Sequence, residues 1–538
     1  MDYNNISKEK LRFADPNRKT GDKKLDTKQM SYAKDVFLRF CKNKSSVVAG
    51  VIIVLLVLFA ILVPAFCETK YSLSLTDDYY LKYKYLLPKC ELFEGTGFWD
   101  GTKKTTINKN SYNMYMALEQ ETGYKAITEI VRDEYVDESG SKKYTYYDVR
   151  IDSYITNGME FLDLTTEQFL DIQRWQNETG IQVIYPAVDI KLKGAFNKDL
   201  IAKSKQKDPD VWYATDGNGN PLIDEKTGDF TACYAMEDAE RFQSLLYRDY
   251  YNYDSLRIEG DPALEGEPGY LYALVSGVRV DENTVACSYK VRVLLNNYFQ
   301  YRYGHEANFL FGTNQKGQDI LTRLASGARF SLILAICISA VNLFIGAIYG
   351  AIEGFYGGVT DLVMERISDV LGGMPSMVVM SLFQLHLASK VGPVWSMVFA
   401  FVLTGWLGMA ARTRMQFYRF KRQEYVLSAR TLGASDARLM FKHIFPNAMG
   451  TLITGSVLMI PGVIFSESSL TYLGIVNLEG STQTSVGTLL ARGNGLLATF
   501  PHVIFWPALF ISLLEISFNL FGNGLRDAFN PSLKGIED

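Results

Sequence analysis

The sequence SVVAGVIIVLLVLFAILVPAF, residues 46–66, contains 21 residues and no charged side chain. A helix needs about 20 apolar residues to cross the roughly 30 Å of hydrocarbon in a bilayer. The segment begins only after 45 mostly polar residues, and no small-residue cleavage site follows it convincingly, so it is unlike a secretory signal peptide. The stretch therefore predicts a transmembrane helix.

The rest of the chain divides into two parts of opposite character. Of the 538 residues, those at 67–310 include 40 acidic and 27 basic residues, a balance of −13, and 26 of the 33 tyrosines. The remainder carries 19 acidic and 28 basic residues and is apolar. Composition therefore indicates an acidic, tyrosine-rich domain inserted into a basic membrane protein.

Five further apolar segments predict transmembrane helices, at 329–352, 362–387, 392–411, 449–472 and 502–522. Six spans place both termini on one side of the membrane. The first 45 residues are rich in Lys and Arg, and eight basic residues lie between 412 and 442, after the fourth span. Because Lys and Arg accumulate in cytoplasmic loops, we expect both termini in the cytoplasm and the acidic segment outside.

The acidic segment has the local signals of an α+β domain. Thr165, followed by Gln168 and later by Gly180, predicts a capped helix, and the residues after it predict a strand. Alternating residues around a Ser-Gly turn predict a hairpin at 127–155, and a similar pattern recurs at 213–235. No metal-ligand spacing and no nucleophile–base set is evident. The tyrosines suit either a recognition surface or the domain's own core.

Six cysteines bear on the redox chemistry of the chain. Four of them fall in the segment expected outside, where disulfides are permitted, and four cysteines allow three pairings that sequence cannot distinguish. Free thiols are an equal alternative. The four are Cys67, Cys90, Cys233 and Cys287, whereas Cys41 is expected inside and Cys337 in the second span.

The loop after the fourth span contains EYVLSARTLGASDARLMFKHIFPN, residues 424–447. Gly433 is placed to take the left-handed conformation that ends a helix, and Ser435 is placed to cap the next one, with Asp436 in its first turn. Pro446 follows the second helical stretch. A helix pair at the end of a span could transmit motion to a soluble partner, or it could only anchor two spans.

This stretch resembles the cytoplasmic coupling loop of ABC importer permeases, and most closely that of the peptide/nickel branch. Ser428 and Phe445 depart from the branch pattern, which has Ala and Leu there, and Leu427 stands where the general family has Glu. The matching residues are Glu424, Tyr425, Val426, Ala429, Arg430, Leu432, Gly433, Ala434, Ser435, His443, Pro446 and Asn447.

Four more blocks resemble the same family in the same order. They are FGTNQKGQDILTRLASGARFSL (311–332), DLVMERISDVLGGMP (361–375), SESSLTYLG (466–474) and FGNGLRDAFNP (521–531). Asn314, Gln318, Asn523 and Asn530 replace the family's usual residues. The single span ahead of these blocks is similar to the C-type subunit of oligopeptide and dipeptide permeases, although that family usually has only a short loop where this chain has residues 67–310.

The resemblance implies an all-α polytopic membrane protein with six transmembrane helices of the type I ABC importer permease fold. A large α+β extracytoplasmic domain would be inserted between helices 1 and 2. The implied organisation is a basic cytoplasmic segment (1–45), the first transmembrane helix (46–66), the extracytoplasmic domain (67–310), the permease core (311–523) with its coupling loop (412–447), and a cytoplasmic tail (524–538).

The implied function is that of a permease subunit in an ATP-driven importer of oligopeptides or dipeptides, located in a bacterial cell membrane. The sequence has no GxxxxGK[ST] motif, so the resemblance assigns ATP and Mg to two separate ABC ATPases. A homologous second permease, an extracellular substrate-binding lipoprotein and membrane lipid would be the other partners, with no role for nucleic acid and no catalytic or metal site in this chain. The residues expected to contact the ATPase are Glu424, Tyr425, Ala429, Arg430, Gly433, Ala434, Ser435 and Pro446.

Several residues in the predicted spans are candidates for packing or for the pathway. Gly346, Gly350 and Gly354 recur every four residues, a spacing that lets helices approach closely. Charges within the membrane are costly and tend to face the bundle, and Arg366 and Asp369 are spaced to pair on a helix. The pathway candidates are Asp361, Arg366, Asp369, Glu467 and Glu515, the last of which has the alternative of bonding a neighbouring helix.

A membrane receptor with an extracellular ligand-binding domain is the alternative function. It explains the acidic domain but not the ordered permease blocks, and no output module follows the last span. The sequence leaves open the substrate, which could be a peptide of any length or a nickel chelate. It also leaves open whether the domain at 67–310 docks a binding protein, covers the pathway or contacts the partner permease.

Overall fold

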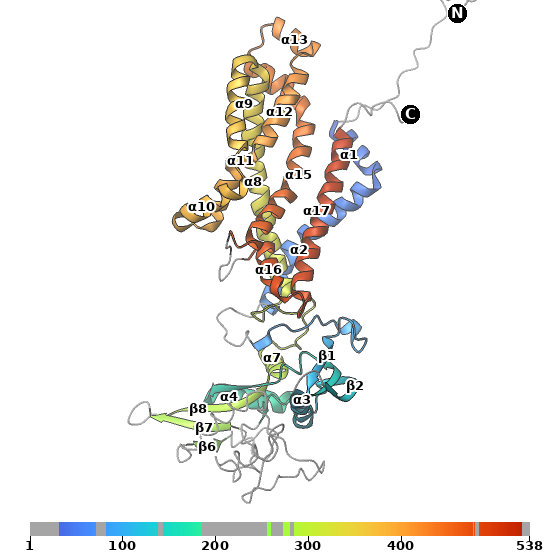
Figure 1. Ribbon diagram of the computed structural model, residues 1–538, viewed down its shortest axis with the longest axis vertical. Coiled ribbons are helices and arrows are strands. Elements are labelled where there is room, and N and C mark those ends of the chain that lie inside the picture. Colours follow the sequence, from blue (N-terminus) through green and yellow to red (C-terminus); the bar gives the residue numbers. More distant parts are fainter. Residues whose placement is uncertain are drawn as a thin grey trace, which may run out of the picture.

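The computed structural model describes residues 32–71, 82–137, 144–185, 256–259, 273–279, 285–476, 478 and 484–529. Figure 1 shows an elongated molecule with a helical bundle at one end and an α/β domain at the other. The α/β domain lies between the second helix and the long helix that re-enters the bundle. The described domain mixes helices and strands, as the sequence predicted.

Among the residues that the structure describes, five helical stretches are long and apolar enough to cross a membrane. They are Lys44–Phe66 in α2 (Lys44–Tyr71), α8 (Ile320–Tyr356), Pro393–Phe420 comprising α11 (Pro393–Gly405) and α12 (Leu407–Phe420), Asp436–Tyr472 ending in α15 (Phe445–Tyr472), and α17 (His502–Phe529). The chain is therefore a polytopic α-helical protein, as predicted.

The segment predicted as one span at 362–387 is instead two helices. They are α9 (Gly358–Gly372) and α10 (Ser376–Val391), and they meet at an angle of 72°. Pro375 precedes α10 in an extended conformation (φ −61°, ψ 124°), and proline both lacks an N–H and disfavours helix in the residue before it. The two helices count as a sixth span only if the bent pair is taken as one crossing.

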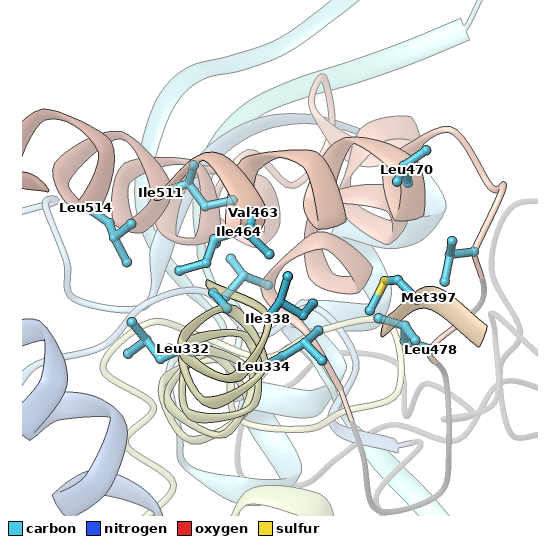
Figure 2. Packing of buried hydrophobic residues seen from close by; sticks show 14 of the residues in the cluster. Leu332, Leu334, Ile338, Met397, Val463, Ile464, Leu470, Leu478, Ile511 and Leu514 are labelled. Carbon is cyan, nitrogen blue, oxygen red and sulfur yellow. The ribbon is translucent and has the colours of Figure 1, made fainter. Parts of the chain in front are cut away.

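The bundle core is built mainly from aliphatic side chains of α2, α8, α10, α11, α15 and α17 and of the segment 476–489 (Figure 2). Figure 2 labels Leu332, Leu334 and Ile338 on α8, with Met397, Val463, Ile464, Leu470, Leu478, Ile511 and Leu514 around them. In a membrane, lipid tails are as apolar as these side chains, so helix association depends on close packing rather than on exclusion of water.

Helices α8 and α12 pack closely where they cross. A methyl group added to Gly346, Gly350 or Gly354 would lie 2.7, 2.1 or 2.7 Å from the nearest atom of the 406–414 segment. At Gly350 and Gly354 that atom is a backbone carbonyl oxygen, of Ala410 and Arg414. The three glycines therefore form one stripe along which the two backbones approach.

The described part of the α/β domain contains two antiparallel sheets. In the first, of order β1-β3-β2, the hairpin predicted from the sequence is formed by β2 (Ile127–Asp137) and β3 (Tyr144–Asp152), and β1 (Thr102–Asn108) pairs with β3 on its other side. Helix α3 (Lys109–Thr122) follows β1, and Tyr112 stacks on Tyr147 with ring centroids 4.1 Å apart. These two tyrosines therefore belong to the core of the domain.

The second sheet has the order β4-β8-β7-β6, with β5 paired to β8. Its strands are β4 (Met159–Thr165), β5 (Ile184–Tyr185), β6 (Leu256–Glu259), β7 (Ala273–Arg279) and β8 (Val285–Leu294). Helix α4 (Thr166–Thr179) begins with the predicted capping box of Thr165 and Gln168 and ends at Gly180 in the left-handed conformation. Helix α7 (Leu295–Tyr303) leads back toward the bundle. The predicted hairpin at 213–235 lies outside the described residues.

Among the cysteines whose side chains are described, Cys41, Cys90 and Cys337 are free. Cys67 and Cys287 lie in α2 and β8, where the backbone alone is described, and Cys233 lies outside the described residues. The disulfide pairing therefore stays open.

The N-terminal helix and the last turns of α17 lie side by side. Phe40 of α1 (Tyr32–Lys42) contacts Phe521 edge to face at 5.1 Å, and the Ser46 hydroxyl donates to the Leu520 carbonyl at 3.1 Å. In Figure 1 these ends lie toward the same end of the bundle as α13 (Glu424–Thr431), opposite the α/β domain.

Candidate functional site

The loop at 424–447 forms a helix, a glycine turn and a second helix. Helix α13 ends at Thr431, and Gly433, two residues further on, has a φ of +83°, the left-handed conformation predicted from the sequence. The Ala434 N–H donates to the Ala429 carbonyl at 3.1 Å, and the Gly433 N–H donates to the Arg430 carbonyl at 3.0 Å. This pair of bonds satisfies carbonyls that a helix end would otherwise leave exposed.

The second helix merges with the next span. Ser435 occupies the N-cap position with extended backbone, but its side chain makes no capping bond. A short α14 (Asp436–Arg438) and a π-helical turn (Leu439–Ile444) lead directly into α15, in whose first turn Pro446 lies. The helix therefore continues past Pro446, because proline is tolerated in a first turn, where its missing N–H costs little.

A buried apolar floor attaches α13 to the bundle. Val426 is fully buried and packs in one cluster with Phe355 at the end of α8, Phe417 on α12, and Leu439 and Ile444 on the π-helical turn. The opposite face of the loop is exposed, and Leu432 at the turn is 88% exposed. Tyr425, Leu427 and Phe441 are exposed in the same loop, and several exposed apolar side chains together are typical of a surface that a partner covers.

An ion-pair cluster lies beneath the loop. The Arg414 guanidinium on α12 donates two bonds to Asp361, at 2.6 and 2.8 Å, and two to Glu365, at 2.7 and 2.8 Å. The Tyr418 hydroxyl donates to Asp361 at 2.7 Å, and Glu353 lies 3.6 Å from Arg414. Paired, charge-assisted bonds of this kind fix geometry as well as supplying energy, so α9 is held against α12.

Two further cations join the loop to the C-terminal end of α8. The Lys421 ammonium donates to the Gly354 carbonyl at 2.8 Å, where the helix dipole favours positive charge. Arg430 lies over the Phe355 ring, 5.6 Å from its centroid. Burial, together with nearby Arg422 and Arg430, lowers the pKa of Lys421.

The structure places the pathway candidates in different environments. Arg366 and Asp369 pair at 3.1 Å on an exposed face of α9, whereas Asp361 pairs with Arg414. Glu467 is buried and accepts bonds from the hydroxyls of Ser331, Ser468 and Thr471 at 3.1 to 3.4 Å. Glu515 is half-buried and accepts a bond from Asn519 one turn along α17.

Sequence inspection did not select Arg414 or Glu365 as site residues. In the sequence Arg414 lies 49 residues from Glu365 and 53 residues from Asp361, so no local spacing indicates the cluster. Within the described residues, no three His, Cys, Asp or Glu side chains are grouped so as to hold a metal ion.

A helical bundle with several apolar spans defines the class, an integral membrane protein. The model of the binding-protein-dependent transport system inner membrane component matches residues 342–535, and that of the N-terminal TM domain of oligopeptide transport permease C matches residues 31–88. The chain belongs to the family of binding-protein-dependent transport system inner membrane components and is a permease subunit of an ABC importer.

Several named relatives are similar to the chain. The oligopeptide transport system permease protein OppC of Bacillus subtilis is 41% identical over 224 residues, which are 42% of this chain and 72% of the relative. The dipeptide transport system permease protein DppC of the same organism is 37% identical, over 42% of this chain and 70% of the relative. OppC of Escherichia coli is 33% identical, over 42% and 73%. These relatives do not favour the receptor alternative.

Proposed function

We propose that this chain forms half of the translocation pathway of an oligopeptide or dipeptide importer and receives the force of ATP hydrolysis through residues 424–447. The observation that carries the proposal is the geometry of that loop. The exposed side of the loop, with Leu432 at its turn, is supported by the buried cluster around Val426. The hydrogen bonds of Arg414 and Lys421 give further support. A force applied to the exposed side of the loop is therefore transmitted to the spans without first deforming the loop.

In this proposal Gly433 sets the turn, and Glu424 and Arg430 set the register on the ATPase. Both charged side chains are exposed, as a contact with a partner requires. The other contact residues of α13 and its turn are Tyr425, Ala429, Ala434 and Ser435, while Pro446 lies in the first turn of the helix that receives the motion. The chain itself binds no cofactor, and ATP and Mg belong to two ABC ATPase subunits.

The orientation follows from charge. Basic residues cluster at 412–442 and in the N-terminal segment, so the loop and both termini lie in the cytoplasm of a bacterium. The bent pair α9–α10 serves as the sixth span. The α/β domain then lies outside the cell membrane, where it docks an extracellular substrate-binding lipoprotein or covers the pathway. A homologous second permease supplies the other half of the pathway.

The pathway candidates are not equivalent under this proposal. Glu467 has its carboxylate occupied by three hydroxyl donors in a buried site, which suits a structural role. Glu515 is half-buried, so it is the better candidate for contact with a peptide ammonium group.

The first test is to tag the chain, extract it gently from its native membrane and identify stoichiometric partners by mass spectrometry. Recovery of a second permease and ABC ATPases supports the proposal. A cysteine at Leu432, oxidised against cysteines in the ATPase surface, should then cross-link, whereas one at Phe344, an exposed side chain within α8, should not. Recovery of the chain alone, or cross-linking at neither site in an intact complex, contradicts the coupling role.

A further inference from the structure

A short loop at the base of the α/β domain carries an exposed apolar tip. Residues 90–99 leave and rejoin the domain at a neck formed by an isolated bridge between Lys89 and Asp100. Leu92 is 89% exposed and Phe98 is 68% exposed, and Phe93 is also exposed. Three large apolar side chains on one loop are unfavourable in water, because each leaves apolar surface uncovered.

The loop is held in one conformation rather than being a loose excursion. The Cys90 N–H donates to the Trp99 carbonyl at 2.8 Å, closing the loop. The Asp100 carboxylate accepts the Gly97 N–H at 2.7 Å, and the Thr96 hydroxyl donates to the Phe93 carbonyl at 2.7 Å. Its exposed tip is therefore a built feature of the fold.

Aromatic contacts join this loop to the membrane-spanning part. Trp99 stacks on Trp506 in the first turns of α17 at 5.4 Å, and Trp506 stacks on Phe311, shortly before α8, at 4.0 Å. In Figure 1 the loop at 90–99, in light blue, lies beside the junction of the bundle and the α/β domain. The loop is thus level with the ends of two spans.

The apolar tip is also continuous with an exposed face of α17. Phe505 contacts Trp506 at 5.0 Å and is exposed, and Leu509 and Leu513, one and two turns further on, are exposed as well. An exposed apolar face on a span is suited to contact with lipid. Tryptophan side chains at the ends of spans are typical of the membrane–water interface, and Glu94 beside Phe93 limits the loop to the headgroup level.

We propose that residues 91–99 insert into the interfacial zone of the bilayer and fix the α/β domain to the membrane surface. The partner of this loop is lipid, rather than a second protein. Leu92, Phe93 and Phe98 enter the zone between headgroups and acyl chains, while Trp99 and Trp506 form the stacked link back to α17. The domain is then supported at two places, by its chain connections and by this loop.

The test uses the full chain in nanodiscs of phosphatidylethanolamine and phosphatidylglycerol. Leu92→Cys is made in a chain whose six native cysteines are replaced, and it is labelled with an environment-sensitive fluorophore. Nitroxide-bearing lipids should quench this label more strongly than a label at Val136→Cys, an exposed apolar position on β2. Equal quenching at both sites, or quenching of Leu92→Cys only by a water-soluble agent, overturns the proposal.

A second measurement keeps the native cysteines. Replacing Trp99 with Phe should remove a component of the tryptophan emission that lipids brominated near the headgroup quench. Replacing Trp175, which packs on Tyr301 within the α/β domain, should remove only an unquenched component. No difference between the two variants contradicts the proposal, and so does a cross-link from Leu92→Cys to a second permease in the assembled transporter.

Discussion

Replacing Gly433 with valine tests whether the turn of the coupling loop transmits work. At this position φ is +83°, and a Cβ atom would meet no other atom within 4 Å. The substitution therefore introduces no clash, and its cost is the left-handed backbone conformation alone, about 1–2 kcal/mol for a residue with a Cβ. That energy lowers the population of the native turn by about 5- to 30-fold relative to its open forms.

The penalty should appear as a local effect. The two bonds that depend on the turn join Ala434 to Ala429 and Gly433 to Arg430, while Val426 and its buried neighbours are untouched. We therefore expect Gly433→Val to fold and to assemble with its partners. In proteoliposomes, peptide uptake per ATP hydrolysed should fall several-fold, while ATP hydrolysis continues.

The matched control is Gly433→Asn, because asparagine tolerates the left-handed conformation far better than valine. It should keep most of the uptake per ATP. Normal coupling in the valine variant would refute the reasoning, and so would equal losses in both variants, which would point to a need for a bare backbone at the ATPase contact.

Three further predictions concern the packing and the titration of the chain. Arg414→Ala removes four charge-assisted bonds to Asp361 and Glu365. Because the Arg414 side chain is 24% exposed, we expect a loss of about 1–2 kcal/mol, seen as a lower Tm and weaker coupling. Gly350→Ala should lower the Tm through about 1–3 kcal/mol of overpacking, whereas Gly462→Ala, whose Cβ would meet nothing within 4 Å, should leave it unchanged or raise it. Burial raises the pKa of Asp319 from 3.8 to about 6, so the folded chain holds this proton to higher pH than the unfolded chain does. Its contribution to the free energy of unfolding is fully present below about pH 3.8 and is lost as the pH rises to about 6. A Tm–pH profile of the detergent-purified protein should show this fall, and Asp319→Asn should remove it.

The local signals in the sequence predicted local structure well. Thr165 and Gln168 form the capping box, and Gly433 adopts the left-handed turn. Such features depend on bonds within a few residues, so their sequence pattern contains nearly all the necessary information. Hydropathy located the spans for the same reason, since a run of about 20 apolar residues is itself the physical requirement.

The features that sequence missed depend on tertiary contacts or on backbone breaks. Hydropathy is continuous across 362–387, and it does not register that Pro375 separates two helices bent by 72°. The Arg414 cluster joins residues about 50 positions apart. Pro446 was likewise ambiguous, because proline is found both after a helix and in the first turn of one.

These contacts determine which spans would move with the loop under the proposed docking. The glycine stripe holds α8 against α12 with backbones in contact, and Arg414 fixes α9 to α12. The second helix of the loop is continuous with α15. A displacement of α13 would therefore move α8, α9 and α12 as one body and α15 through its own helix. Helix α10 is joined to α11 by hydrogen bonds from Gln384 to the Pro393 carbonyl and from Ser396 to the Phe383 carbonyl. Because α11 and α12 form one span, α10 would follow that body. A joint displacement of these helices is the consequence to look for in the transport cycle.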